Sequence, residues 1–270
     1  MKSKERKRKT KRKTKMKWKH KNKKNKNMQI RKLFLTAYFW SISVAALLIT
    51  FPIYMILYLF MNQKSLARFY EFFPGFIILN AMLVPGFWTL KYKDLRKDKN
   101  WNGQRYVIVA NHLSFIDSLV LSTLPVKKKY MIGKIFTKIP IFGTMGLLSG
   151  YVPVDRNAPN KMTSLENSGV HRAVETIRDG SGFCIFPEGM RNPTPGRLLP
   201  FKSGAYYIAF MSDVPILPVC LKGTEKAMPI GGMVDYGEIE VVIGEPFSVE
   251  AAEDIPQLIN RTQNFLYNHI

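Results

Sequence analysis

The chain has 270 residues, enough for one sizeable domain with an appendage. Its formal net charge is +22, but residues 1–32 hold 18 Lys or Arg against the single acid Glu5 and so carry +17 of it. The other 238 residues carry only +5, which excludes a uniformly basic domain. Two cysteines, Cys184 and Cys220, stand in apolar runs. So sparse a pair excludes a disulfide framework and favours core packing.

The first segment in chain order is the polybasic tail, residues 1–32. Such a like-charged, Lys- and Asn-rich run buries no apolar surface, so we expect it to be disordered. Its partner is nucleic acid, anionic lipid or nothing. Because an apolar segment follows directly, we expect anionic headgroups and no nucleic acid. A non-catalytic, membrane-anchored protein whose tail binds nucleic acid is the distant alternative.

Residues 33–60, "LFLTAYFWSISVAALLITFPIYMILYLF", contain no charged side chain. These 28 positions exceed the ~20 that a helix needs to cross a bilayer. The run stays bulky and aromatic to its end, unlike a cleaved signal peptide, so it predicts a retained anchor. The cations before it predict a cytoplasmic N-terminus by the positive-inside rule.

A second apolar stretch, "FFPGFIILNAMLVPGFWTL" at 72–90, is followed by a cluster of lysines and an arginine. Together the two segments predict a membrane-anchoring helical hairpin over residues 33–92, which either spans the bilayer or dips into one leaflet. Such a hairpin returns residues 93–270 to the cytoplasmic face. If only the first segment spans, the domain faces the other side.

Residues 93–270 alternate strand-like apolar runs with helical patterns. This order predicts an α/β domain, a mixed sheet flanked by helices, with its site where strands end and loops begin. The predicted strands are 105–110, 128–132, 150–154, 182–187, 214–221 and 238–243. The predicted helices are 116–124, 135–147, 163–179, 202–212 and 252–268.

The stretch "VIVANHLSFIDSLVL", 107–121, places a histidine and an aspartate at a strand exit. In one continuous helix His112 and Asp117 would point about 140° apart. If His112 lies in the exit loop and Asp117 in the first helical turn, with Ser114 as the cap, the carboxylate reaches the imidazole. The pair would then act as a general base without its own nucleophile; the alternative is a structural role.

A second group of polar residues follows the predicted strand 182–187. Glu188, Gly189 and Arg191 stand at its exit, and Arg197 and Lys202 follow. Forked guanidinium groups suit phosphate, and Glu188 could position Arg191 or accept from a substrate hydroxyl. A solvated loop is the alternative.

Two further strand-like runs carry weaker indications. The run at 150–154 delivers Asp155 and Arg156 to a loop, which makes Arg156 a second phosphate ligand. Pro215 and Pro218 interrupt the run at 214–221 and predict an edge strand or a bulge. This strand could line an acyl groove or belong to the core.

Over roughly residues 100–245 the chain resembles the 1-acyl-glycerol-3-phosphate acyltransferase family of the bacterial PlsC type. Asn111, His112 and Asp117 match its Asn-His-x4-Asp motif, and "FPEGMR" at 186–191 matches its Phe-Pro-Glu-Gly-Thr-Arg motif. Two departures occur where Met190 replaces the usual threonine and Asn192 the usual serine. They put the acceptor in doubt more than the reaction.

The resemblance implies acyl transfer from acyl-CoA or acyl carrier protein to the sn-2 hydroxyl of a lysophosphatidic acid, with His112 as base and Asp117 as its orienting partner. It implies no metal and no further cofactor. Glycerol-3-phosphate or another lysophospholipid is the alternative acceptor. The residues implied at the substrate phosphate are Glu188, Gly189, Arg191, Arg156 and Lys134.

Overall fold

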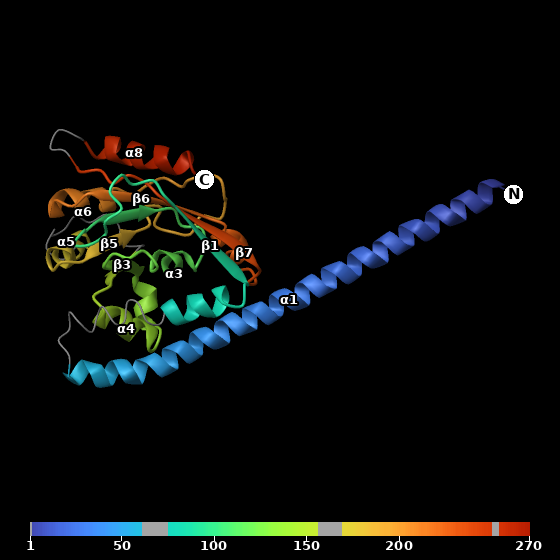
Figure 1. Cartoon of the computed structure of the whole chain (residues 1–270), viewed down its shortest axis with the longest axis horizontal. Helices are drawn as coiled ribbons and strands as arrows, with labels where there is room; N and C mark the ends of the chain where they lie inside the picture. Colours follow the sequence, from blue (N-terminus) through green and yellow to red (C-terminus); the bar gives the residue numbers. More distant parts are fainter. Residues whose placement is uncertain (1, 61–74, 156–168, 250–253) are drawn as a thin grey trace.

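The computed structural model describes residues 2–60, 75–155, 169–249 and 254–270. A single sheet with helices on both faces forms the body of the molecule. Helix α1 (Lys2–Phe60) runs along this body and continues far beyond it (Figure 1). The predicted class, an α/β domain with a mixed sheet, is confirmed.

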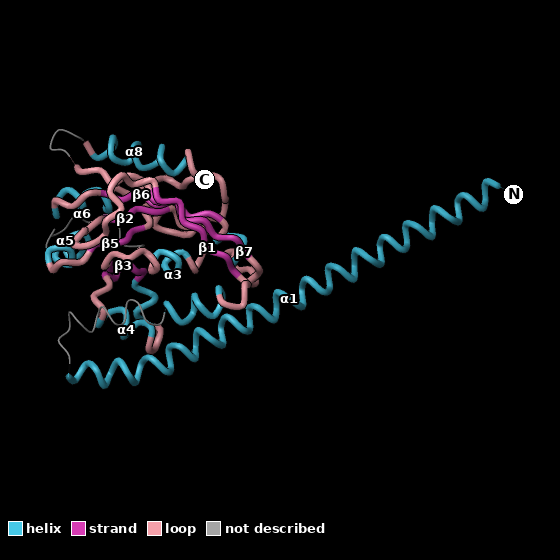
Figure 2. Tube along the Cα trace, viewed as in Figure 1, coloured by secondary structure: helices cyan, strands magenta, loops and turns pink. Residues whose placement is uncertain are grey.

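The sheet has the strand order β1-β7-β6-β2-β5-β3-β4, and its strands lie side by side in Figure 2. Strands β2 to β6 are mutually parallel, β7 is antiparallel to β6, and β1 pairs in parallel with β7. The carboxyl ends of β2 to β6 therefore share one edge. All six predicted strands are present with ends within two residues of the prediction. The bounds are β1 Trp88–Asp94, β2 Val107–Ala110, β3 Lys128–Gly133, β4 Val152–Val154, β5 Gly182–Ile185, β6 Ile216–Lys222 and β7 Gly237–Ile243.

Helices cover the two faces of the sheet because its central strands are apolar throughout and buried. One face packs against α3, the helical residues 75–83 and the part of α1 that is buried on the domain, residues 35–54, named here the docked part of α1. The other face packs against α5, α6 and α8. Both cysteines are buried free thiols, as predicted. The remaining bounds are α3 Asp117–Leu121, η1 Lys134–Lys138, α4 Phe142–Leu148, α5 Gly169–Arg178, α6 Gly204–Ser212, α7 Thr224–Ala227 and α8 Ile255–Tyr267.

The second apolar stretch differs from its prediction. Residues 88–90, expected in the membrane hairpin, begin β1, and Trp88 is buried against the core opposite Gly237. The helical residues 75–83 pack beside α1, where Tyr38 donates to the Ala81 carbonyl. The described residues 75–83 rise about 13 Å, less than half of a hydrocarbon core of about 30 Å. The apolar run of the sequence continues without a break across the turn at Gly86, which has a φ of 74°, so the pattern alone does not separate the helix from β1.

The polybasic tail also differs from its prediction, because residues 2–32 are helical and continuous with the apolar segment. Lys, Arg and Gln are good helix formers, and extending a nucleated helix needs no new nucleus. The side chains of residues 15–31 are all exposed to solvent. Residues 2–32 therefore form a basic rod, and its described side chains 15–31 bury nothing apolar.

Beyond the tail, α1 packs on the domain through one narrow stripe. Its buried residues recur every three or four positions and include the hydroxyl groups of Ser43 and Thr50, each bonded to a carbonyl one turn earlier. The opposite side is exposed and, apart from Ser41, apolar. The buried stripe comprises Leu35, Phe39, Ser43, Ala46, Thr50 and Tyr54. The exposed face, named here the outer face of α1, includes Leu33, Phe34, Val44, Leu48, Ile49, Ile53 and Ile56.

Candidate active site

The carboxyl ends of the parallel strands bring the predicted motifs together. His112 lies just beyond β2 and Glu188 just beyond β5, and these two strands are paired neighbours. On the other side, the Asn111 amide extends the ladder to β6 by donating to the Leu221 carbonyl at 2.9 Å and accepting from the Leu221 N–H at 2.7 Å. The loop carrying His112 is thus held between two strands.

The predicted contact between His112 and Asp117 is present. The His112 Nδ1 lies 2.8 Å from the Asp117 Oδ2, and α3 begins at Asp117. The same oxygen accepts the N–H groups of Leu113 and Ser114 at 2.6 and 2.7 Å. Ser114 does not cap α3 as predicted; its hydroxyl donates to the Met228 carbonyl instead. The Asp117 carboxylate instead accepts the backbone N–H groups of the loop that precedes α3.

The His112 ring is held in one orientation. Phe186 stacks on it with ring centroids 4.0 Å apart and planes 12° apart. Because a carboxylate only accepts, Nδ1 carries the proton, which leaves the Nε2 lone pair available to accept one. Asp117 is fully buried, whereas the His112 side chain is 14% exposed. A small reactant can therefore reach the imidazole but not its partner.

Glu188 connects the two loops. Its Oε1 accepts the His112 N–H at 2.9 Å, and its Oε2 accepts from the Asn192 amide and the Leu199 N–H, each at 3.0 Å. The Asn192 N–H in turn donates to the His112 carbonyl at 2.6 Å. Burial raises the pKa of Glu188 above its usual range, although the N–H donors oppose that shift. Both backbone groups of His112 are thereby fixed.

A tight turn follows Glu188. Gly189 has a φ of 72°, and a β-carbon there would lie 3.0 Å from the Lys202 Cε. Only glycine fits this conformation without strain. The Lys202 side chain therefore lies against the turn, and it brings a positive charge to the rim beyond β5.

Residues 92–222, which include both loops, match the protein family described as Acyltransferase. Over these residues the chain is similar to that family. The fold agrees with a solved structure, the 1-acyl-sn-glycerophosphate acyltransferase PlsC from Thermotoga maritima, with a TM-score of 0.72 over 89% of this chain and 95% of that one. Sequence identity to it is 22%, so this likeness concerns the fold.

Curated relatives are similar in sequence to this chain over about half of its length. A chloroplastic 1-acyl-sn-glycerol-3-phosphate acyltransferase from Brassica napus is 36% identical over 52% of this chain and 40% of its own length. The human beta form of an enzyme of that name is 32% identical over 57% of this chain and 55% of its own. The chain thus spans about half the length of these relatives.

The residues assigned to phosphate occupy different positions in the α/β domain. Arg191 is half-buried beyond β5, and its guanidinium makes no hydrogen bond or ion pair within the described ranges. Lys134 is exposed beyond β3, about 10 Å or two strand spacings from the β2 exit. Arg156 lies outside the described residues. Glu188 does not position Arg191, because its oxygens accept from the loop donors instead.

The two prolines were predicted to mark an edge strand or a bulge. β6 is not an edge strand, because it lies between β2 and β7, and Pro218 is buried opposite Val109. A bulge is present: Val219 pairs with Ile243 and Ile216 with Phe247, so the chain opposite Pro218 contributes one residue more than β6 between these pairs. Pro218 is tolerated there because the Gly244 N–H donates to its carbonyl and no return bond is needed. Pro215 precedes β6 at the sheet edge opposite His112. Neither position supports the predicted acyl groove.

The importance of Asn192 was missed in the sequence. From the sequence, Asn192 was expected only to lack the hydroxyl of the usual serine. In the structure it is buried, its amide donates to Glu188 and to the Arg197 carbonyl, and its oxygen accepts the Thr194 N–H at 2.9 Å. An Asn-Pro pair is typical of such side-chain turns, so "NPT" at 192–194 could have indicated it.

We expect Glu188→Gln to destabilise the domain by about 1–3 kcal/mol, because one amide N–H would oppose a donor of the loops. Turnover should fall by about tenfold or more through the displaced His112. Burial raises the pKa of Glu188 in the folded protein above its ordinary value of 4.5. The free energy of unfolding of wild type should therefore exceed that of Glu188→Gln most below pH 4.5, and the difference should decrease as the pH rises through the folded pKa. Urea unfolding at several pH values and steady-state kinetics measure both, with the exposed Glu175→Gln as control. Unchanged turnover would remove Glu188 from the positioning of His112.

Proposed function

We propose that the chain transfers an acyl group from acyl-CoA or acyl carrier protein to the sn-2 hydroxyl of 1-acyl-glycerol-3-phosphate and forms phosphatidic acid. The observation that carries the proposal is the His112–Asp117 pair at the carboxyl edge of the sheet. A base without a protein nucleophile suits a reaction in which the substrate supplies the alcohol. The names of the curated relatives support this acceptor.

In the proposed reaction the substrate hydroxyl loses its proton to the His112 Nε2 as its oxygen attacks the thioester carbon. Asp117 stabilises the imidazolium, and backbone N–H groups bind the oxyanion. When the tetrahedral intermediate collapses, the carbon–sulfur bond breaks and His112 returns the proton to the leaving thiolate. No further cofactor enters this sequence.

The substrate phosphate would bind to the half-buried Arg191, at the turn that Gly189 makes possible. A guanidinium can bind two phosphate oxygens at once. Arg156 is retained as a second ligand of this proposal, and Lys134 at the rim as a third. Glu188 serves the site by fixing the loop and not by contacting phosphate, since a buried carboxylate would repel it.

The membrane association of the chain rests on α1, the helix of the described residues that is long and apolar enough to cross a bilayer. We propose that it lies in one leaflet instead. Its buried stripe from Leu35 to Tyr54 extends about 30 Å along the domain, which is the thickness of the hydrocarbon core. A spanning α1 would pull the polar domain into the lipid; an in-plane α1 leaves only its outer face there.

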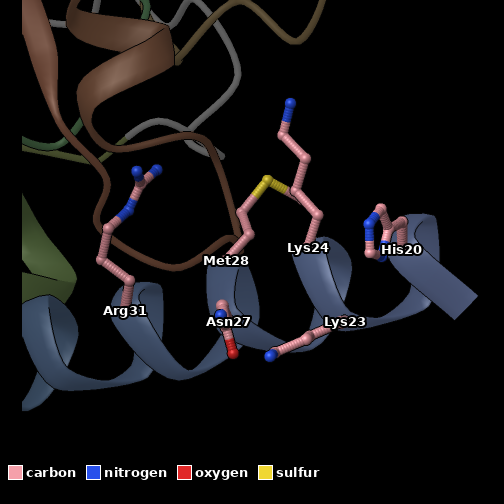
Figure 3. A pocket seen from close by; sticks show the side chains of 6 residues that line it. All are labelled: His20, Lys23, Lys24, Asn27, Met28 and Arg31. Carbon is pink, nitrogen blue, oxygen red and sulfur yellow. The ribbon is translucent and has the colours of Figure 1, made fainter.

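The basic rod before the outer face would bind anionic headgroups on the cytoplasmic side. Figure 3 shows a hollow on this rod, to which no residue of the catalytic loops contributes. Cationic side chains that suit headgroup phosphates point around it, and most of its accessible lining is apolar. Its lining residues are His20, Lys23, Lys24, Asn27, Met28 and Arg31.

A panel of acceptors tests the proposal. Full-length protein in detergent receives labelled acyl-CoA with lysophosphatidic acid, lysophosphatidylcholine or glycerol-3-phosphate. We expect the first to be acylated best, and Arg191→Ala to raise its KM by about 10–100-fold, because a charged hydrogen bond to phosphate is lost.

The exposed Arg178→Ala is the matched control, because Arg178 lies on α5, where its side chain pairs with Glu175, and not at the proposed site. Acylation of lysophosphatidylcholine alone would assign the enzyme to another lysophospholipid. An unchanged KM in Arg191→Ala would remove this residue from the phosphate site.

A further inference from the structure

The segment from η1 to α4, named here the η1–α4 hairpin, exposes apolar side chains next to the active site. Ile135 is 67% exposed, Ile139 47% and Leu147 46%. Two exposed cations, Lys134 and Lys138, stand among them. Isolated exposed isoleucines are ordinary, but a group of apolar side chains interspersed with lysines within 14 residues is typical of a surface that contacts lipid headgroups.

The hairpin is a tightly built element. Phe142 donates its N–H to the Pro140 carbonyl at 2.7 Å across Ile141, whose φ of 65° and ψ of −65° define a strained γ-turn. A β-carbon on Gly143 would lie 2.3 Å from the Thr137 carbonyl oxygen, so the two arms touch through their backbones. With the arms this close, the exposed isoleucines cannot fold inward between them.

The location of the hairpin connects the lipid-facing helix with the catalytic edge. Its first residue directly follows β3, at the edge that carries His112. Its other arm packs on α1, where Met145 and Tyr54 are fully buried and the partly buried Ile141 and Leu148 pack against them. Figure 1 shows α4 between the sheet and the far end of the docked part of α1. The hairpin that exposes these side chains thus packs directly on the helix that carries the outer face.

We propose that the η1–α4 hairpin is a second membrane contact, which inserts Ile135, Ile139 and Leu147 among the lipids of an anionic leaflet. Lys138 then meets headgroup phosphates, while Lys134 stays at the rim of the proposed substrate site. The inference rests on the in-plane placement of α1 proposed above and extends it. A single helix allows the domain to roll about its axis; a second contact beside β3 fixes that rotation and turns the catalytic edge toward the leaflet, where an acyl-bearing acceptor resides.

Site-specific fluorescence tests the contact directly. Full-length protein carrying Ile139→Cys is labelled with the polarity-sensitive dye NBD and mixed with vesicles of phosphatidylcholine and phosphatidylglycerol. Labelling is selective because both native thiols are buried and burial raises their pKa to about 12. We expect a blue shift and quenching by spin-labelled lipid. Ile49→Cys on the outer face of α1 is the positive control, and Phe210→Cys on α6, across the sheet, is the negative control.

Vesicle partitioning supplies a second measurement. Ile135→Ser combined with Ile139→Ser should lower the partition coefficient by about tenfold or more, whereas Phe210→Ser should leave it unchanged. Activity on acceptors dissolved in detergent should persist in both. A dye that responds at position 49 but stays in water at 139 overturns the second contact alone. If the dye shows no blue shift at either position, both the second contact and the in-plane placement of α1 are wrong. Activity in detergent shows separately whether the proposed reaction is correct.

Discussion

Replacing His112 by alanine should lower kcat for acyl transfer by about 10²–10⁴-fold, the usual contribution of a positioned general base. The imidazole is the group of the described site that can take the hydroxyl proton, since Asp117 is fully buried behind it. The KM for the acceptor should change little, because the phosphate would bind elsewhere. Initial rates with labelled acyl-CoA over a range of acceptor concentrations separate the two constants.

The loss must be distinguished from unfolding, since the ring stacks on Phe186. Removing an aromatic pair costs about 1 kcal/mol, so the melting temperature should fall only modestly. His171→Ala on α5 serves as the matched histidine variant. Transfer at the wild-type rate by a folded His112→Ala protein would eliminate the proposed base.

The sheet and the catalytic pair could be predicted because each depends on local pattern. Apolar runs separated by helical periods determine the parallel strands, and parallel strands place their exits on one edge. His112 and Asp117 are five residues apart across one strand exit, so their meeting needed only that the helix begin between them. Glu188 was predicted beside this pair but not bonded to the His112 backbone, a link that joins two distant loops.

Other features could not be predicted because tertiary packing decides them. The apolar run through Trp88 is compatible with a membrane helix or a buried strand, and only pairing with β7 selects the strand. Pro215 and Pro218 indicated an edge strand or a bulge, and only the pairing on both sides of β6 decides that Pro218 lies at a bulge of an internal strand. Tail residues were expected to be disordered on composition, while the docked part of α1 supplies the nucleus for their helix.

The Asp117→Asn variant should lower kcat by about 10²–10⁴-fold while preserving the geometry of the site. The Asp117 Oδ2 accepts from the imidazole and from two backbone N–H groups, whereas its Oδ1 has no partner within the described ranges. An asparagine can place its oxygen at the Oδ2 position and keep all three bonds, with its amide nitrogen at the position of Oδ1. What it removes is the negative charge that stabilises the imidazolium in the transition state.

A double-variant cycle tests whether this charge acts through His112. Residues that work as a unit are strongly non-additive, so the protein with both His112→Ala and Asp117→Asn should be no slower than His112→Ala alone. Measuring kcat for the four proteins gives the coupling, and their melting temperatures show whether the fold persists. Losses that multiply would mean that Asp117 contributes independently of the imidazole. Because the carboxylate is inaccessible to substrate, that outcome would leave it only a structural role and would contradict the proposed mechanism.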